Sequence, residues 1–220
     1  MRAVDLISHS IPNLRLQDTV RRALQLMADF HIAHLPVVGD DKFLGMVEEN
    51  ELMDVEDEAQ EIGSLDIPRL RVAILQDEHF LSALRLWKLH KISIIPVIKT
   101  DGEFVGVISS GELLSALDEY IGADEPGGII QLSMEPRNFS LGEVGRLVES
   151  NDASVIHIVT YKDPNNGQLL VSIKVNRNDI QDIIATFQRY EYTIEAYYGD
   201  NLAEDDLRAN YAHLMNYLNI

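Results

Sequence analysis

The sequence has no cysteine among its 220 residues and only one tryptophan. The absence of cysteine excludes disulfide bonds, thiolate metal sites and cysteine nucleophiles. No apolar stretch is long enough to cross a bilayer, and residues 1–5 lack the apolar core of a signal peptide. We therefore expect a cytoplasmic protein.

Basic side chains are also scarce. The chain has 18 Lys and Arg against 36 Asp and Glu, which gives a formal net charge of -18. Binding to a phosphate backbone depends on clustered Lys and Arg, and no such cluster occurs. Nucleic acids and anionic membranes are therefore not expected as partners. The hydrophobic share of 46% is that of a folded globular chain of one or two domains.

Recognisable catalytic motifs are missing from the sequence as well. It has no P-loop and no G-x-G-x-x-G motif, and Ser109-Ser110-Gly111 does not form a G-x-S-x-G nucleophile elbow. His31 and His34 are three residues apart with no third histidine nearby, so a metal site is not predicted. We expect a protein that is not an enzyme and requires no cofactor.

The feature that organises the chain is a stretch present twice, at residues 16–53 and 75–114. The copies align at a spacing of 60 through an apolar-Pro-Val segment and at 61 through an apolar-Gly-apolar segment. The matched pairs include Ile32 with Ile92, Pro36 with Pro96, Phe43 with Phe104, Gly45 with Gly106, and Glu51 with Glu112. Agreement in both the apolar pattern and the positions of proline and glycine indicates a structural duplication.

Each copy is predicted to form a helix, two strands and a second helix. In the first copy the second helix is expected over residues 49–62. The acidic residues 54–61 are then a solvated helix face and not a divalent-cation loop, which would need a glycine turn. Neither copy has enough apolar surface for a stable core alone, so we expect the two to pack sheet to sheet as one unit.

The polar segment 123–128, rich in Gly and Pro, is the predicted domain boundary. Strands at 129–134, 155–161, 169–175 and 192–198, with helices at 140–149 and 179–190, follow the βαββαβ order of a ferredoxin-like fold. Residues 203–218 are expected to form a last helix with a narrow apolar stripe. That helix either covers the sheet of its own domain or packs on a partner chain.

The duplicated pattern resembles a tandem pair of CBS domains, and the βαββαβ unit is similar to an ACT domain. This combination resembles the acetoin-utilisation type of bacterial CBS protein. The predicted fold class is α+β: two βαββα-like CBS repeats packed sheet to sheet, a ferredoxin-like ACT-type domain and a C-terminal helix. The expected boundaries are 1–62 and 63–122 for the repeats, 127–199 for the ACT-like domain and 200–220 for the helical tail.

The CBS resemblance implies adenosine-ligand sites where a hydroxyl and a carboxylate follow the glycine-containing strand. Ser109 and Glu112 hold these places in the second copy. In the first copy Glu48 and Glu51 hold them, and a carboxylate at Glu48 would repel phosphate. The resemblance places adenine against apolar residues at the Pro-Val strands: His34, Leu35, Pro36, Ile94, Ile95 and Pro96. Ordinary core packing is the alternative for the apolar members, and a helix cap is the alternative for Ser109 and Glu112.

These observations predict a regulatory homodimer that senses a small ligand and relays binding through domain or dimer packing to a regulated protein. AMP, ADP, ATP or S-adenosylmethionine is the expected regulatory ligand. Two alternatives stay open: a dimerisation or interaction module without a ligand, and amino-acid sensing through the ACT-like domain.

Overall fold

The computed structural model of the protein describes residues 1–8 and 10–199. The chain forms two compact units, the first covering Met1–Leu117 and the second beginning at Asp118. The helix predicted at 203–218 lies outside the described residues. Within the described residues, no helix combines the length and the apolar character needed to cross a membrane.

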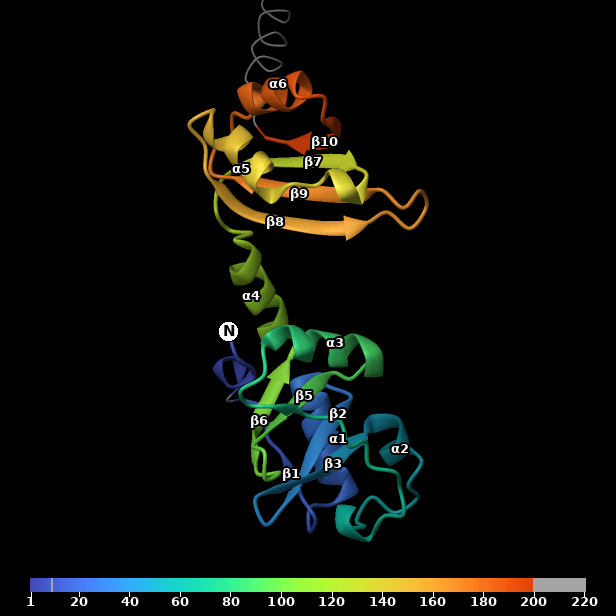
Figure 1. Ribbon diagram of the computed structural model, residues 1–220. Helices are drawn as coiled ribbons and strands as arrows, with labels where there is room; N and C mark the ends of the chain where they lie inside the picture. The colour runs from blue at the N-terminus through green and yellow to red at the C-terminus, as the bar shows by residue number, and fades with distance from the viewer. Residues whose placement is uncertain (9, 200–220) are drawn as a thin grey trace, which may run out of the picture. The chain divides into compact units, whose positions relative to one another are not determined.

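The first unit contains one arrangement of elements twice (Figure 1). The first copy consists of β1 (Leu14–Arg15), α1 (Val20–Phe30), β2 (His34–Gly39), β3 (Lys42–Glu48) and α2 (Glu49–Met53). The second copy consists of β4 (Ile74–Leu75), α3 (Phe80–His90), β5 (Ile94–Ile98), β6 (Phe104–Ser109) and α4 (Ser110–Ile121). Short 3-10 helices, η1 (Ala3–Leu6) and η2 (Ile62–Ser64), precede the two copies.

The duplication seen in the sequence is confirmed in the backbone. Each copy has a three-stranded sheet, in the order β1-β2-β3 or β4-β5-β6, whose first pair is parallel and second pair antiparallel. α1 and α3 end in the same way, because His31 and Lys91 adopt the left-handed conformation with φ of 53° and 54°. A left-handed residue at this position ends a helix and turns the chain toward the next strand.

Both copies contribute to one hydrophobic core, as predicted. Helix positions such as Val20 and Ala83 are buried beside strand positions such as Val37 and Val97. Each fully buried aliphatic side chain contributes about 1.5–3 kcal/mol of burial free energy. The two sheets therefore stabilise each other as one unit.

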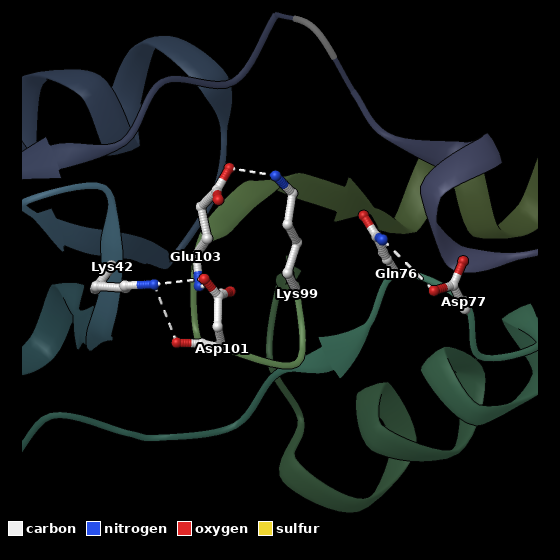
Figure 2. A network of polar contacts seen from close by, with 6 residues as sticks. All are labelled: Lys42, Gln76, Asp77, Lys99, Asp101 and Glu103. Atoms are coloured by element: carbon white, nitrogen blue, oxygen red, sulfur yellow. Dashed lines mark hydrogen bonds and ion pairs between the residues drawn. The ribbon is translucent and has the colours of Figure 1, made fainter.

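The turns of the two hairpins also contact each other. The Phe104 N–H donates to the Asp41 carbonyl (2.8 Å), the Phe43 N–H donates to the Gly102 carbonyl (3.1 Å), and the two phenylalanine rings stack at 6.5 Å. Figure 2 shows Lys42 reaching across to Asp101, with Nζ 2.8 Å from Oδ2. These contacts hold β3 of one copy beside β6 of the other.

The predicted helix over 49–62 is wrong beyond Met53, where α2 ends. Residues 54–61 are irregular because some of their carbonyls accept hydrogen bonds from another helix, α1. The Gln60 and Glu58 carbonyls accept the Val20 and Arg21 N–H groups (both 3.0 Å), which are among the first N–H groups of α1 and have no partner inside that helix. Within the described part of the chain, no group of three or more His, Asp or Glu side chains could hold a metal ion.

The second unit has the predicted βαββαβ order. Its elements are β7 (Ile129–Met134), η3 (Pro136–Asn138), α5 (Leu141–Glu149), β8 (Val155–Lys162), β9 (Leu169–Val175), α6 (Gln181–Arg189) and β10 (Thr193–Tyr198). The antiparallel sheet has the order β10-β7-β9-β8, and α5 and α6 lie together on one of its faces (Figure 1). Val144 and Phe187 from these helices are buried against Ile130 and Ile173 of the sheet. This is the architecture of an ACT-like domain.

The segment that precedes β7 is held against β9. The Gly128 N–H donates to the Arg177 carbonyl (2.8 Å), and the Val175 N–H donates to the Gly128 carbonyl (2.9 Å). Lys174 is only 5% exposed, and its Nζ donates to the carbonyls of Gly122 and Ala123 at the end of α4. A cation at the C-terminal carbonyls of a helix is electrostatically favourable.

Candidate functional site

The glycine in each apolar-Gly-apolar strand allows another segment to lie directly on the strand. A Cβ at Gly45 would lie 2.7 Å from the Arg69 Cβ, and a Cβ at Gly106 would lie 2.5 Å from the Ile7 Cγ2. The crossing segments are fixed by backbone hydrogen bonds. Leu70 exchanges hydrogen bonds with Met46 (2.9 and 3.0 Å), and the Ser8 N–H donates to the Val107 carbonyl (2.8 Å). Each copy therefore has a short segment beside the residues that follow its glycine strand.

In the second copy this arrangement brings together three side chains, which we call the serine–glutamate cluster: Ser8, Ser109 and Glu112. The Ser109 hydroxyl donates to the Glu112 carboxylate, and its oxygen accepts the Gly111 N–H at the start of α4 (3.1 Å). Burial alone would raise the pKa of Glu112, but hydrogen bonds from Ser109, from its own backbone and from Ser8 lower it below the usual value. Glu112 is therefore an ionised acceptor at neutral pH.

Ser8 was not predicted from the sequence. It is 8% exposed and lies 101 positions before Ser109 in the chain. The sequence contains no local motif around Ser8 that marks it.

A cavity of about 490 Å³ also involves the first residue of α4, Ser110. It is lined by Ala33, His34, Trp87, Lys88, Lys91, Ile92, Ser93 and Ser110. Its charged lining consists of two lysines without any carboxylate. In a chain with a net charge of -18, such a cavity favours an anionic ligand.

In the first copy, the counterparts of Ser109 and Glu112 line a cavity of about 400 Å³, which we call the first cleft. Its lining residues are His34, Met46, Glu48, Glu51, Pro68, Arg69, Leu70, Arg71 and His90. The predicted Glu48 and Glu51 do lie together here. The two arginines on the crossing segment were not predicted, because they lie between the two copies and outside the repeated pattern.

His34 lines both cavities and also joins the two copies. The Ser93 N–H donates to its Nδ1 (3.3 Å), the Ser93 hydroxyl is 3.2 Å from the same nitrogen, and the Ala33 N–H donates to Ser93 Oγ (3.1 Å). Nδ1 must therefore be the unprotonated nitrogen of this ring. Burial lowers the pKa of His34, against the smaller opposing effect of Glu48 and Glu51.

The apolar residues predicted to meet adenine are buried in the core. Leu35, Ile94 and Ile95 have no exposed surface, and Pro36 and Pro96 are buried on β2 and β5. The burial of these side chains agrees with the interpretation that they pack in the core. Contact of these side chains with a ligand stays a prediction.

Comparison with known proteins agrees with the duplicated fold. The model of the family described as "CBS domain" matches residues 3–58 and 66–119, together half of the chain. A curated relative is the inosine-5'-monophosphate dehydrogenase of Methanocaldococcus jannaschii, 22% identical over 114 residues, which are 51% of this chain and 23% of that enzyme. The chain thus spans about a quarter of the enzyme's length.

Two solved structures have a similar fold. A CBS domain pair/ACT domain protein from Thermotoga maritima has a TM-score of 0.50 and 21% identity, over 55% of this chain and 99% of that one. CBSX2, solved in complex with AMP, has a TM-score of 0.47 and 19% identity, over 54% of this chain and 97% of that one. Likenesses at this level of identity concern the fold alone. From its family match and its two equivalent repeats, the chain belongs to the CBS domain family and carries a tandem CBS pair.

Proposed function

We propose that this protein is a non-catalytic regulator that binds an adenosine nucleotide at the serine–glutamate cluster and relays binding through domain or dimer packing. The observation that carries the proposal is Glu112, whose carboxylate accepts hydrogen bonds from the Ser109 hydroxyl and from the Ser109 N–H (3.1 Å). A ribose hydroxyl is an equivalent donor and can replace the serine hydroxyl. Charge-assisted hydrogen bonds of this kind are about twice as strong as neutral ones.

The phosphate end of a nucleotide is accommodated by the start of α4. Two of the first N–H groups of this 12-residue helix, those of Gly111 and Glu112, donate to the Ser109 oxygen (3.1 and 3.4 Å), so a phosphate would replace that oxygen as their acceptor. Lys88 and Lys91, which line the cavity beside Ser110, add positive charge there. A nucleotide thus meets an acceptor for its ribose and cations for its phosphate within one CBS pair.

Isothermal titration of the full chain with AMP, ADP and ATP tests the proposal. We expect binding that Glu112→Gln weakens about tenfold, because one charge-assisted hydrogen bond is lost. Glu119→Gln, which removes a carboxylate of the same helix away from the cluster, is the matched control and should bind normally. Absence of binding, or equal binding by Glu112→Gln, would refute the nucleotide site.

A dimerisation module is the second candidate, and the outer surface of α3 favours it. Leu81 and Leu89 of this helix lie on the same side of it and are 41% and 68% exposed. Exposed apolar side chains gathered on one helix indicate a protein interface. Sedimentation of the wild type and of Leu89→Lys separates the roles: a dimer that Leu89→Lys dissociates, together with no response to nucleotides, would favour the module.

Amino-acid sensing by the ACT-like domain receives less support. A cavity of about 640 Å³ lies at one end of its sheet. Its lining includes Glu135, Glu143, Glu191 and Glu195 but no lysine or arginine. The carboxylate of an amino acid would meet like charges there, which is unfavourable. A melting experiment with the common amino acids tests this alternative, and a raised midpoint would support it.

A further inference from the structure

The sheet of the second unit has helices on one face only (Figure 1). Along β7, Ile130, Leu132 and Met134 are buried toward α5 and α6, so the alternate side chains of this strand lie on the opposite face. We call that face the open face. Two rows of side chains that the strand register aligns across β7, β9 and β8 form its middle: Gln131, Ser172 and Val159, and Ser133, Leu170 and Tyr161.

One end of the open face already holds the end of a helix. Lys174 is paired with His157 there, and its Nζ donates to the carbonyls of Gly122 and Ala123, just after α4. His157 forms a hydrogen bond with the backbone of Ile121, the last residue of α4. Helical backbone therefore fits against this face of the sheet.

The rest of the open face is exposed and carries no charge. Val159 and Tyr161 are 42% and 46% exposed. Gln131 donates from Nε2 to the Tyr161 hydroxyl, and because β9 lies between β7 and β8, these two side chains span the middle of the sheet. Away from Lys174 and His157, the side chains that the register places on this face are apolar or neutral, although 25% of all residues are charged. An exposed surface of this kind is typical of one that another segment covers.

The chain continues from this sheet into a segment of suitable length. It leaves the sheet after Tyr198, on the edge strand β10 beside β7. The predicted helix over 203–218 would be about 24 Å long, and the six residues of β7 extend about 20 Å. Residues 199–202 can reach about 13 Å, which is more than two strand spacings of about 4.8 Å. The helix can therefore begin over the middle of the sheet and lie along its strands.

The predicted helix also has the polarity that the open face requires. Its apolar side chains are spaced four, three and four residues apart and share one stripe: Leu207, Tyr211, Leu214 and Leu218. A helix of this length is marginal alone in water and gains most of its stability from packing such a stripe.

We propose that residues 203–218 form a helix that packs its apolar stripe on the open face of its own sheet. The short connection holds the helix at a high effective concentration beside this sheet. The same helix of a second copy would have to approach against the repulsion between two chains that each carry a net charge of -18. The open face is thus closed from within the chain.

Thiol protection tests the proposal, because the chain has no cysteine of its own. Val159→Cys introduces a thiol on the open face, and Gln188→Cys introduces one on the exposed side of α6 as the matched control. In the full chain we expect Val159→Cys to react with iodoacetamide about tenfold more slowly than Gln188→Cys, since the covering helix must first open. Adding Tyr211→Lys and Leu214→Lys should restore a fast rate, whereas Asn216→Lys, on the opposite side of the predicted helix, should not.

A cross-link separates the helix of the same chain from that of a second copy. Val159→Cys combined with Tyr211→Cys and treated with a short bismaleimide should give an intra-chain product that migrates with the monomer under denaturing conditions. Gln188→Cys combined with Tyr211→Cys should give little of it. Thermal melting of each variant checks that it folds.

Three results would overturn the proposal. The first is a Val159→Cys thiol that reacts as fast as Gln188→Cys. The second is protection that persists after Tyr211→Lys and Leu214→Lys. The third is a cross-linking reaction whose product is a covalent dimer, or which gives no intra-chain product. These measurements use no nucleotide, so they are independent of the proposed nucleotide site.

Discussion

The two CBS repeats share their order of strands and helices but differ in the side chains at corresponding places. Where the first repeat has Glu48, the second has Ser109, and where the segment on β3 has Arg69, the segment on β6 has Ile7. The shared helices and strands follow from a shared apolar pattern. Glu48 and Ser109 lie outside the buried core, whereas Ile7 packs against it. A duplicated fold thus presents different side chains at two equivalent places.

The largest expected effect concerns the glycines that the repeats share. Gly45→Ala should destabilise the protein by about 2–4 kcal/mol, because φ at this residue is +131° and the new Cβ would lie 2.7 Å from the Arg69 Cβ. Gly106→Ala should cost less, about 1–2 kcal/mol, because its only close contact is a movable methyl group of Ile7. Urea unfolding of both variants measures the difference. Equal losses would contradict this account of the crossing segments.

The next effect concerns Ser93, whose counterpart in the first repeat is Ala33. Ser93→Ala should cost about 1–3 kcal/mol, because it leaves the Ala33 N–H without its acceptor and removes the contact of the hydroxyl with His34. The reciprocal change, Ala33→Ser, should add no stabilising contact. The second-repeat counterpart of His34 is Ile94, whose side chain cannot form a hydrogen bond with the new hydroxyl. Urea unfolding of the two variants is the measurement, and a neutral Ser93→Ala would show that this contact does not join the repeats.

An exchange of site chemistry should follow from Glu48→Ser. This substitution gives the first repeat the hydroxyl of the second and removes the carboxylate that repels phosphate, so AMP affinity for the first cleft should rise about tenfold. Titration with AMP in a Glu112→Gln background, compared with Glu112→Gln alone, measures the contribution of the new site. Glu49→Ser, at the adjacent position, is the matched control. Unchanged AMP binding by Glu48→Ser would mean that another group excludes phosphate.

A smaller effect should appear with pH at His34. Its pKa in the folded protein is lowered, mainly by burial, so the unfolded chain takes up a proton more readily. The stability from the neutral ring is complete above the unfolded value of about 6.5 and is lost as pH falls from there toward the folded pKa. His34→Asn, which keeps an acceptor near Nδ1, should reduce this dependence. Melting curves from about pH 7.5 to 5.5 test it, with the same change at the exposed His31 as the control.

The smallest effect is expected at the hairpin turns. Lys42 and Asp101 form an ion pair between the repeats, but their side chains are 45% and 58% exposed (Figure 2). Exposed pairs contribute little because solvent screens them. Lys42→Ala should therefore leave the melting midpoint nearly unchanged at both low and high salt. A clear, salt-dependent loss would mean that the pair holds the two hairpins in register.

The repeated elements could be predicted from the sequence. The elements and residues whose structure depends on contacts with distant parts of the chain could not. The Pro-Val strands, the glycine strands and the βαββαβ order all follow from local periodicity. The helix expected over 49–62 failed because residues 54–61 satisfy the first N–H groups of α1, a requirement imposed by another element. Ser8, Arg69 and Arg71 were missed for a similar reason, since each belongs to a segment that reaches its site only by crossing a strand.

The amino-acid sequence by itself determined the duplication, the α+β class and the placement of Ser109 and Glu112 at a helix start. The spacing of apolar residues and the turn residues determine local structure over a few positions. They can therefore be recognised in the sequence without knowledge of long-range contacts. Only the tertiary structure decided that Ser8 joins that pair, that His34 is held by Ser93, and that Arg69 and Arg71 line the same cavity as Glu48 and Glu51. Such contacts join residues far apart in the chain, and burial and charge act through space.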